Sequence, residues 1–471
     1  MVGGVQSKIG NNMLRAVKRR WHSPSGYKEV LVLAIPLVIT TSSGSLQSFI
    51  DRMFLSWFDS NALAATVPAA MICFTLTALF VGTASYVGVF VAQYFGAREE
   101  QKIGASVWQG FYIIGLSLLV VIPVFIFAEP LFRWIGHDPI LQAMEASYSQ
   151  ILILSIPLMI VSGSLSGFFS GISRTSVVMW SNLLITVLNL LLDYGLIFGN
   201  WGLPRMGVAG AAWATVISVA VGTAVQLWIF LKPEYRQRFK THLHWQPNWR
   251  LFKRLLHFGF PVGLQMQMQA LAWTLFVLLI GKIGIAELTA HSIAMNVFMI
   301  AVMPVAGMSI AVSVLVGQRL GDSNPDAAER ATHSAVHLAA VFFVFAGIML
   351  ITQPDWFIEP FSRGMEASIY QTTVPLVHDL LRLVALFCLF EAVSMMMAGA
   401  LKGAGDTRFV AWTGIACSWL VLVLPTALLV YFWGGKLLWS WMFFVLNGLL
   451  MCVVHWLRFR GAKWKVLRVI N

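Results

Sequence analysis

The stretch "SGFFSGISRT" at residues 166–175 recurs as "AGALKGAGDT" at residues 398–407, an offset of 232 positions. Three shorter pairs recur in the same order at an offset of 225. They are "LAIPLV" with "FGFPVG" from residues 33 and 258, "NALAAT" with "AELTAH" from 61 and 286, and "AQYFGA" with "GQRLGD" from 92 and 317. Agreement in order and offset indicates an internal duplication, and one insertion of seven residues reconciles the two offsets.

The composition is that of a membrane protein. Hydrophobic residues make up 58% of the 471 residues and charged residues 11%, whereas a soluble domain carries about 25% charged residues. Twelve apolar runs are long enough to cross about 30 Å of hydrocarbon. They are predicted at 29–57, 64–92, 106–128, 148–171, 178–199, 207–231, 254–281, 288–317, 332–352, 377–401, 409–432 and 436–457. The first run is longer than a signal-peptide core of about 7–15 residues, so we interpret it as a retained transmembrane helix.

Basic residues predict the orientation. If the N-terminus lies in the cytoplasm, the inside segments hold 25 of the 32 Lys and Arg and the outside segments hold 7. This positive-inside bias predicts an even number of spans, with both termini cytoplasmic in the inner membrane. We therefore interpret the net charge of +12 as the result of the orientation of the helices in the lipid bilayer, with basic residues on the cytoplasmic side. We expect no nucleic-acid partner, because the basic residues are scattered at segment ends.

The duplication predicts two halves with the same orientation, because each copy holds an even number of spans. The expected fold is an all-α polytopic membrane protein, with twelve transmembrane helices in two pseudo-symmetric six-helix lobes around a central cleft. The expected parts are a basic N-terminal segment (1–28), a first lobe (29–231), a basic linker (232–253), a second lobe (254–457) and a basic tail (458–471). We expect the two lobes to superimpose.

Two spans carry polar stripes with matching spacing. The fifth span holds Asn182, Thr186, Asn189 and Asp193, and the first holds Thr40, Gly44, Gln47 and Asp51, both at steps of 4, 3 and 4. This spacing places each set on one helical face. Asp51 and Asp193 both lie late in spans that run outward, so we expect the two carboxyl groups at similar depth in the first lobe.

Carboxylates at membrane depth point to a transport function. An ionised acid at the bilayer centre costs about 2.5–3.5 kcal/mol on insertion scales, and burial or a second nearby carboxylate favours the protonated form. Such an acid can load and release a proton, and Asn189 could serve either state or help to bind a cation. The alternative is a satisfied polar contact between helices, and Arg52 could form an ion pair with Asp51.

The second lobe offers further polar residues as candidates for the coupling site and the substrate cleft. Glu391 lies midway through the tenth span, and Gln265 and Gln269 lie one turn apart in the seventh. We predict a coupling site at Asp51, Asn189, Asp193 and Glu391. The candidates for the substrate cleft are Gln47, Thr186, Gln265 and Gln269.

Other classes of protein lack support in the sequence. No G-x-x-x-x-G-K-[ST] phosphate loop occurs, which argues against ATP hydrolysis by that route. No clustered catalytic side chains are evident, so we expect no enzyme activity, no cofactor and no bound structural metal. The loop "GAREEQKIG" (96–104) lacks the G-x-x-x-D-R-x-G-R-R pattern of a major-facilitator carrier.

Several motifs together resemble one family over nearly the whole chain. They are Pro36 with Asp51 and "LAAT" (63–66), "VAQYFGA" (91–97), "SGFFSGISRT…NLLLDYGLIFG…GVAGAAWAT" (166–215) and "GALKGAGDT" (399–407). On these motifs the sequence resembles the multidrug and toxic compound extrusion (MATE) family. The resemblance implies two six-helix lobes and export of amphipathic, often cationic, small molecules in exchange for protons or sodium.

The resemblance also implies site residues. The family's first-lobe cation site corresponds to Asp51, Asn189 and Asp193, and a second-lobe acid of the sodium-coupled branch corresponds to Glu391. Gln269 stands where that branch has a glutamate, which favours protons as the coupling ion. A sodium-coupled exporter and a lipid-linked precursor flippase of the same wider superfamily remain alternatives. We expect the transporter to act as a monomer.

Overall fold

The computed structural model describes residues 18–136, 138–362 and 367–470, so much of the predicted N-terminal segment 1–28 lies outside the described residues. Every regular element within these ranges is helical. Twelve helical segments are long and apolar enough to cross a membrane, as the sequence predicts. The predicted fold class, an all-α membrane protein with twelve spans in two lobes, is confirmed.

The first six spans contain ten named helices. They are α2 (Tyr27–Phe58), α3 (Ser60–Ser85), α4 (Val87–Gly96), η1 (Glu100–Lys102), α5 (Ile103–Phe111), α6 (Ile113–Ile135), α7 (Pro139–Leu152), α8 (Ser155–Gly171), α9 (Thr175–Phe198) and α10 (Val208–Phe230), with η2 (Asn200–Gly202) between the last two. Short breaks divide three of these spans, for example at Tyr86 between α3 and α4. Hydropathy alone does not reveal such breaks, because the apolar run continues through them.

The last six spans follow the short linker helix α11 (Pro233–Phe239). They contain α12 (Trp249–Gly281), α13 (Ile285–Gly321), α14 (Pro325–Thr352), α15 (Pro354–Ser362), α16 (Ala367–Ala404), α17 (Thr407–Cys417), α18 (Leu424–Trp433) and α19 (Leu437–Arg460). A π-helical turn, Ser418–Val423, joins α17 to α18 within the eleventh span. The 3-10 helix η4 (Lys463–Val466) follows α19.

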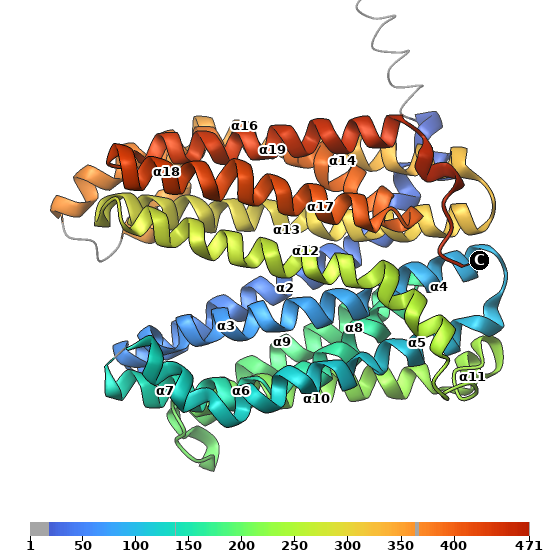
Figure 1. The fold of residues 1–471 in the computed structure, drawn as a ribbon, viewed down its shortest axis with the longest axis horizontal. Coiled ribbons are helices and arrows are strands. Elements are labelled where there is room, and N and C mark those ends of the chain that lie inside the picture. Colours follow the sequence, from blue (N-terminus) through green and yellow to red (C-terminus); the bar gives the residue numbers. More distant parts are fainter. Residues whose placement is uncertain (1–17, 137, 363–366, 471) are drawn as a thin grey trace, which may run out of the picture.

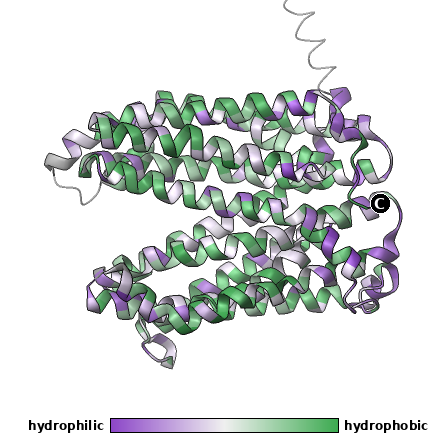
Figure 2. Cartoon of the chain, in the orientation of Figure 1, coloured by the Kyte–Doolittle hydropathy of each residue, from purple (hydrophilic) through white to green (hydrophobic). Residues whose placement is uncertain are grey.

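The helices form two bundles that lie side by side. Figure 1 shows α3 to α10 in the lower bundle and α12 to α19 in the upper one, with α2 running between them. The bundles approach one another at the end that carries α11 and the segment after α19, which we call the linker end. Figure 2 shows hydrophobic residues along the helices and hydrophilic residues concentrated at the linker end. This distribution fits helices that cross a bilayer.

Polar contacts join the second bundle to α2, to the residues just before α2 and to the first bundle, and they extend from the linker end to mid-span. They include Arg20 Nε to Ser334 Oγ (3.3 Å), Tyr27 with His337 (3.0 Å), Tyr86 Oη to the Lys402 carbonyl (2.7 Å), Thr41 Oγ1 to the Met303 carbonyl (3.0 Å) and the ion pair of Arg319 with Glu29. A typical intramolecular hydrogen bond is worth about 0.5–1.5 kcal/mol net. Together these contacts hold the linker end closed in this structure.

Two repeat-related glutamines make the same contact from opposite bundles. Gln93 at the end of α4 donates to the Gly403 carbonyl of α16 at 3.0 Å, and Gln318 of α13 donates to the Gly171 carbonyl of α8 at 2.7 Å. Gln93 and Gln318 are 225 residues apart, and Gly171 and Gly403 are 232 apart. The repeated motifs of the sequence therefore meet as a reciprocal pair of clasps, each reaching from one bundle to the other.

Glycines let the clasps approach closely. A Cβ atom added at Gly96 would lie 1.9 Å from the carbonyl oxygen of Gln318, and one at Gly321 would lie 2.1 Å from that of Gln93. Both separations are far inside van der Waals contact. The closed linker end therefore requires glycine at these two repeat-related positions.

Candidate functional site

The first bundle positions its polar stripe through close packing of α9 on α10. A Cβ atom added at Gly210 of α10 would lie 2.6 Å from the carbonyl oxygen of Leu196 on α9. The short connection between the two helices makes them antiparallel neighbours. This approach brings Thr215, further along α10, beside Asn189 of α9.

Asp51 and Asp193 lie together in the structure, whereas the two stripes predict only that they lie at similar depth. The side chains of Asp51, on α2, and Asp193, on α9, interact directly. Asp193 is fully buried. Both of its carboxyl oxygens and Oδ1 of Asp51 are buried with no hydrogen-bond partner among the described residues. Arg52, which follows Asp51, is exposed but adds its positive charge to the surroundings of the pair.

Asn189 and Thr215 lie next to this acid pair and are joined by a hydrogen bond. The Asn189 amide Nδ2 donates to Thr215 Oγ1 at 3.4 Å, and that hydroxyl donates to the Ala211 carbonyl at 3.2 Å. Asn189 is 1% exposed and lies one helical turn from Asp193. The amide is therefore held in place within reach of the carboxyl pair.

Tyr148 of α7 completes the surroundings. Its side chain is 8% exposed and interacts electrostatically with both Asp51 and Asp193. A phenol can donate a hydrogen bond to a carboxylate or accept one from a carboxylic acid. The site thus combines two acids, an amide, a hydroxyl and a phenol, contributed by four helices.

The chemistry of this arrangement follows from burial. Two adjacent carboxylates that lack hydrogen bonds cannot both remain ionised in a low-dielectric interior without a counter-charge. A proton or a small cation supplies that charge. An oxygen-rich site of this kind suits either, since hard cations prefer carboxylate, carbonyl and hydroxyl ligands.

Glu391 lies within the second bundle. It is half-buried on α16 and interacts with Cys388 of the same helix and Cys452 of α19. The nearby buried His455 hydrogen-bonds with Ser394 Oγ at 3.1 Å and Thr413 Oγ1 at 3.4 Å. Glu391 thus lies among residues of the second bundle, and the structure does not bring it to the Asp51–Asp193 pair.

The predicted substrate residues fall in different environments. Thr186 is buried on α9, and Gln47 is half-buried on α2. Gln265 is 4% exposed and packs against Gly414 of α17, inside the second bundle. Gln269, one turn further along α12, is half-buried. Gln47 and Thr186 thus share the two helices that carry the carboxyl pair.

Sequence reasoning missed Thr215 and Tyr148 as parts of the site. Thr215 ends the motif "GVAGAAWAT", whose small residues signal a close helix contact, but the motif does not identify the partner helix. Tyr148 carries no local signal, because its position near the acids depends on how α7 packs. Only the tertiary structure places them.

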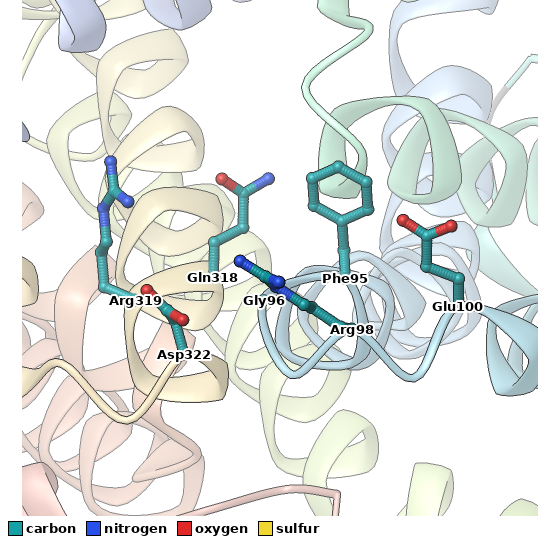
Figure 3. Close-up of a pocket in the computed structure, with 7 residues that line it drawn as sticks. All are labelled: Phe95, Gly96, Arg98, Glu100, Gln318, Arg319 and Asp322. Atoms are coloured by element: carbon teal, nitrogen blue, oxygen red, sulfur yellow. The ribbon is translucent and has the colours of Figure 1, made fainter.

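A separate pocket lies at the linker end. It has a volume of about 360 Å³ and is lined from both bundles by Phe95, Gly96, Arg98, Glu100, Gln318, Arg319 and Asp322 (Figure 3). Glu100 pairs with Arg238, and Arg319 pairs with Glu29 at the start of α2. Asp51 lies 22 residues further along α2, or about 33 Å at 1.5 Å per residue. This pocket lies between residues that meet when the linker end is closed, and it is remote from the acid pair.

Comparisons with known proteins agree on one family. The MatE family model matches residues 36–195 and 261–429. The chain is 31% identical over 381 residues to the probable multidrug resistance protein NorM of Burkholderia pseudomallei (strain K96243), covering 80% of each chain. It is 28% identical over 449 residues to the probable multidrug resistance protein NorM of Pseudomonas putida (strain KT2440), covering 94% of this chain and 96% of that protein.

Solved structures agree on the fold. A structure described as the outward-facing conformation of a multidrug resistance MATE family transporter superimposes with a TM-score of 0.81 at 21% sequence identity. The match covers 95% of this chain and 98% of that one. With the family model matching most of the chain, the protein belongs to the MATE family of multidrug efflux transporters.

Proposed function

We propose that this protein exports amphipathic, often cationic, small molecules in exchange for protons that load at the Asp51–Asp193 pair. The observation that carries the proposal is the fully buried Asp193 beside the half-buried Asp51, with three buried carboxyl oxygens that lack hydrogen-bond partners among the described residues. A buried acid pair that accepts a proton from one side and releases it to the other can couple a gradient to transport. Asn189, Thr215 and Tyr148 surround the pair with polar groups that can serve both protonation states.

The coupling follows from differential affinity. Protonation neutralises the first-bundle site and favours close packing of α2 on α9, whereas the ionised pair favours water or a bound cation. If the two arrangements of the bundles differ in proton affinity, proton loading shifts the equilibrium between them. Substrate binds between the bundles, with Gln47 and Thr186 as polar contacts on the same helices and Gln265 and Gln269 as candidates on α12.

We further propose that the linker end is cytoplasmic, in the inner membrane. The concentration of Lys and Arg in the linker and in the segment after α19 supports this orientation. In this orientation the closed linker end corresponds to an outward-facing state. One chain supplies both bundles and the complete acid pair, which supports a monomeric transporter.

Separate ion gradients distinguish protons from sodium. Purified protein in liposomes should export a fluorescent cationic dye when a pH gradient alone is imposed, because the proposed site needs only a proton. A sodium gradient alone, with pH equal on both sides, should give little export. Dye efflux measured under each gradient tests this, and sodium-driven export without a response to pH would overturn the proton assignment.

The second-bundle acid should contribute less than the first-bundle pair. We expect Glu391→Gln to slow export less than about threefold, or ~0.7 kcal/mol, because Glu391 has no acidic partner at Gln269. Initial dye efflux under a pH gradient, normalised to the amount of inserted protein, measures the effect. Complete loss of export in Glu391→Gln, with Asp193→Asn still active, would reverse the proposed ranking of the two bundles.

A further inference from the structure

The segment after α19 crosses from the second bundle to the first. Figure 1 shows it running from the end of α19 toward the first bundle at the linker end. Ala462, with a φ of 56°, turns the chain out of the helix, and η4 follows at once. The sequence predicts only a basic tail over residues 458–471, because five of these residues are Lys or Arg.

The first half of the segment is anchored to the second bundle. Trp464 is 1% exposed, stacks on Phe459 with ring centroids 4.8 Å apart, and donates its indole N–H to the Phe459 carbonyl at 2.8 Å. Lys465 bonds to Glu329 at 2.6 Å and to Asp326 at 3.3 Å, both at the start of α14. The hydrogen bond with Glu329 raises the pKa of Lys465, so the ammonium group stays charged at neutral pH.

The second half of the segment is docked at the junction of the bundles. Val469 is fully buried, and its backbone N–H donates to Gln93 Oε1 at 2.8 Å. Its side chain packs over Gly405, just after α16, where an added Cβ would lie 2.9 Å from Val469 Cγ1. Val469 and Ile470 both belong to a buried cluster that includes Val87, Phe90 and Tyr94 of the first bundle.

Gln93 links this segment to the closure of the linker end. Its amide Nε2 donates to Gly403 of the second bundle while its Oε1 accepts from Val469. The repeat-related Gln318 makes the corresponding bond to Gly171, and its amide also donates to Ser173 Oγ at 2.9 Å. The contact with Val469 therefore lies outside the repeated pair of clasps and adds to one of them.

From these contacts we infer that residues 461–470 form a strap that stabilises the closed linker end and is released when that end opens. Opening separates Gln93 from Gly403, so Val469 cannot keep its contacts with both bundles. The strap biases the resting equilibrium toward the closed state through burial that exists only there. The inference rests on the proposed two-state transport cycle, but it does not depend on the identity of the coupling ion.

Two valines of the strap provide a matched test. Val469 is fully buried and Val466 is 80% exposed, so Val469→Glu should release the strap and Val466→Glu should not. The reporter is Thr83→Cys on α3, which is 3% exposed and packs against Gly259 of α12, where the two bundles meet. The four native cysteines are replaced by serine. The rate of maleimide labelling at position 83 then reports opening, without any gradient or substrate.

We expect Val469→Glu to raise the labelling rate at least about fivefold and Val466→Glu to leave it within about twofold. Val469→Ala, which removes burial without adding charge, should give an intermediate increase and covers the case in which the glutamate variant misfolds. Monodisperse elution and a single cooperative melting transition confirm folding. Unchanged labelling in a folded Val469→Glu or Val469→Ala variant, or an equal increase in Val466→Glu, would overturn the strap. Failure of proton coupling would leave this result unaffected, because labelling is measured at equilibrium.

Discussion

Liposomes that contain Asp193→Asn should export dye at least about tenfold more slowly than wild type under a pH gradient, a loss of ~1.4 kcal/mol or more. The amide keeps the shape of the side chain and can be accommodated beside Asp51 and Asn189, so we expect the variant to fold and insert. It cannot take up and release a proton. Substrate binding should persist while gradient-driven export is lost.

The control for this variant is Asp59→Asn. Asp59 caps α3 by accepting a hydrogen bond from the Asn61 backbone N–H at 2.9 Å, and asparagine caps a helix about as well as aspartate. This change also neutralises one acid of the first bundle, yet export should stay near the wild-type rate. If Asp193→Asn exports as fast as Asp59→Asn, the carboxyl group on α9 is a structural contact and the proposed coupling is wrong.

The sequence identifies both residues of the acid pair and predicts that they lie at the same depth. Asp51 and Asp193 could be expected at one depth because stripe spacing and span direction are both local properties. Their direct contact depends on α2 packing against α9, which the sequence only suggests. Thr215 and Tyr148 could not be assigned, because each reaches the site through packing of a helix that carries no acid.

The sequence repeats identify the residues that close the linker end, but they do not predict the contacts that these residues make. The pairing of "AQYFGA" with "GQRLGD" identifies Gln93 and Gln318 as equivalent residues. It does not reveal that each glutamine reaches a carbonyl of the opposite bundle. Val469 is harder still, because a buried valine among Lys and Arg has no periodic pattern, and its burial arises only when two bundles meet.

The largest steric effect should come from the close approach at Gly96. In Gly96→Leu, the new Cβ would lie 1.9 Å from the Gln318 carbonyl oxygen, and backbone on both sides leaves little room to yield. The linker end should no longer be able to close. Export should therefore fall by about tenfold or more, equivalent to at least ~1.4 kcal/mol. Dye efflux and labelling of Thr83→Cys in the same variant measure the two consequences.

The matched control is Gly115→Leu on α6, where an added Cβ would meet nothing within 4 Å. Both changes add the same side chain to a helical glycine of the first bundle, so helix propensity and insertion are balanced between them. Gly115→Leu should export normally, with position 83 protected. Gly96→Leu should lose export and label rapidly at position 83, because transport requires the linker end to close as well as open. Normal export in Gly96→Leu would mean that the clasp contact is dispensable, and that the linker end closes through the other inter-bundle bonds alone.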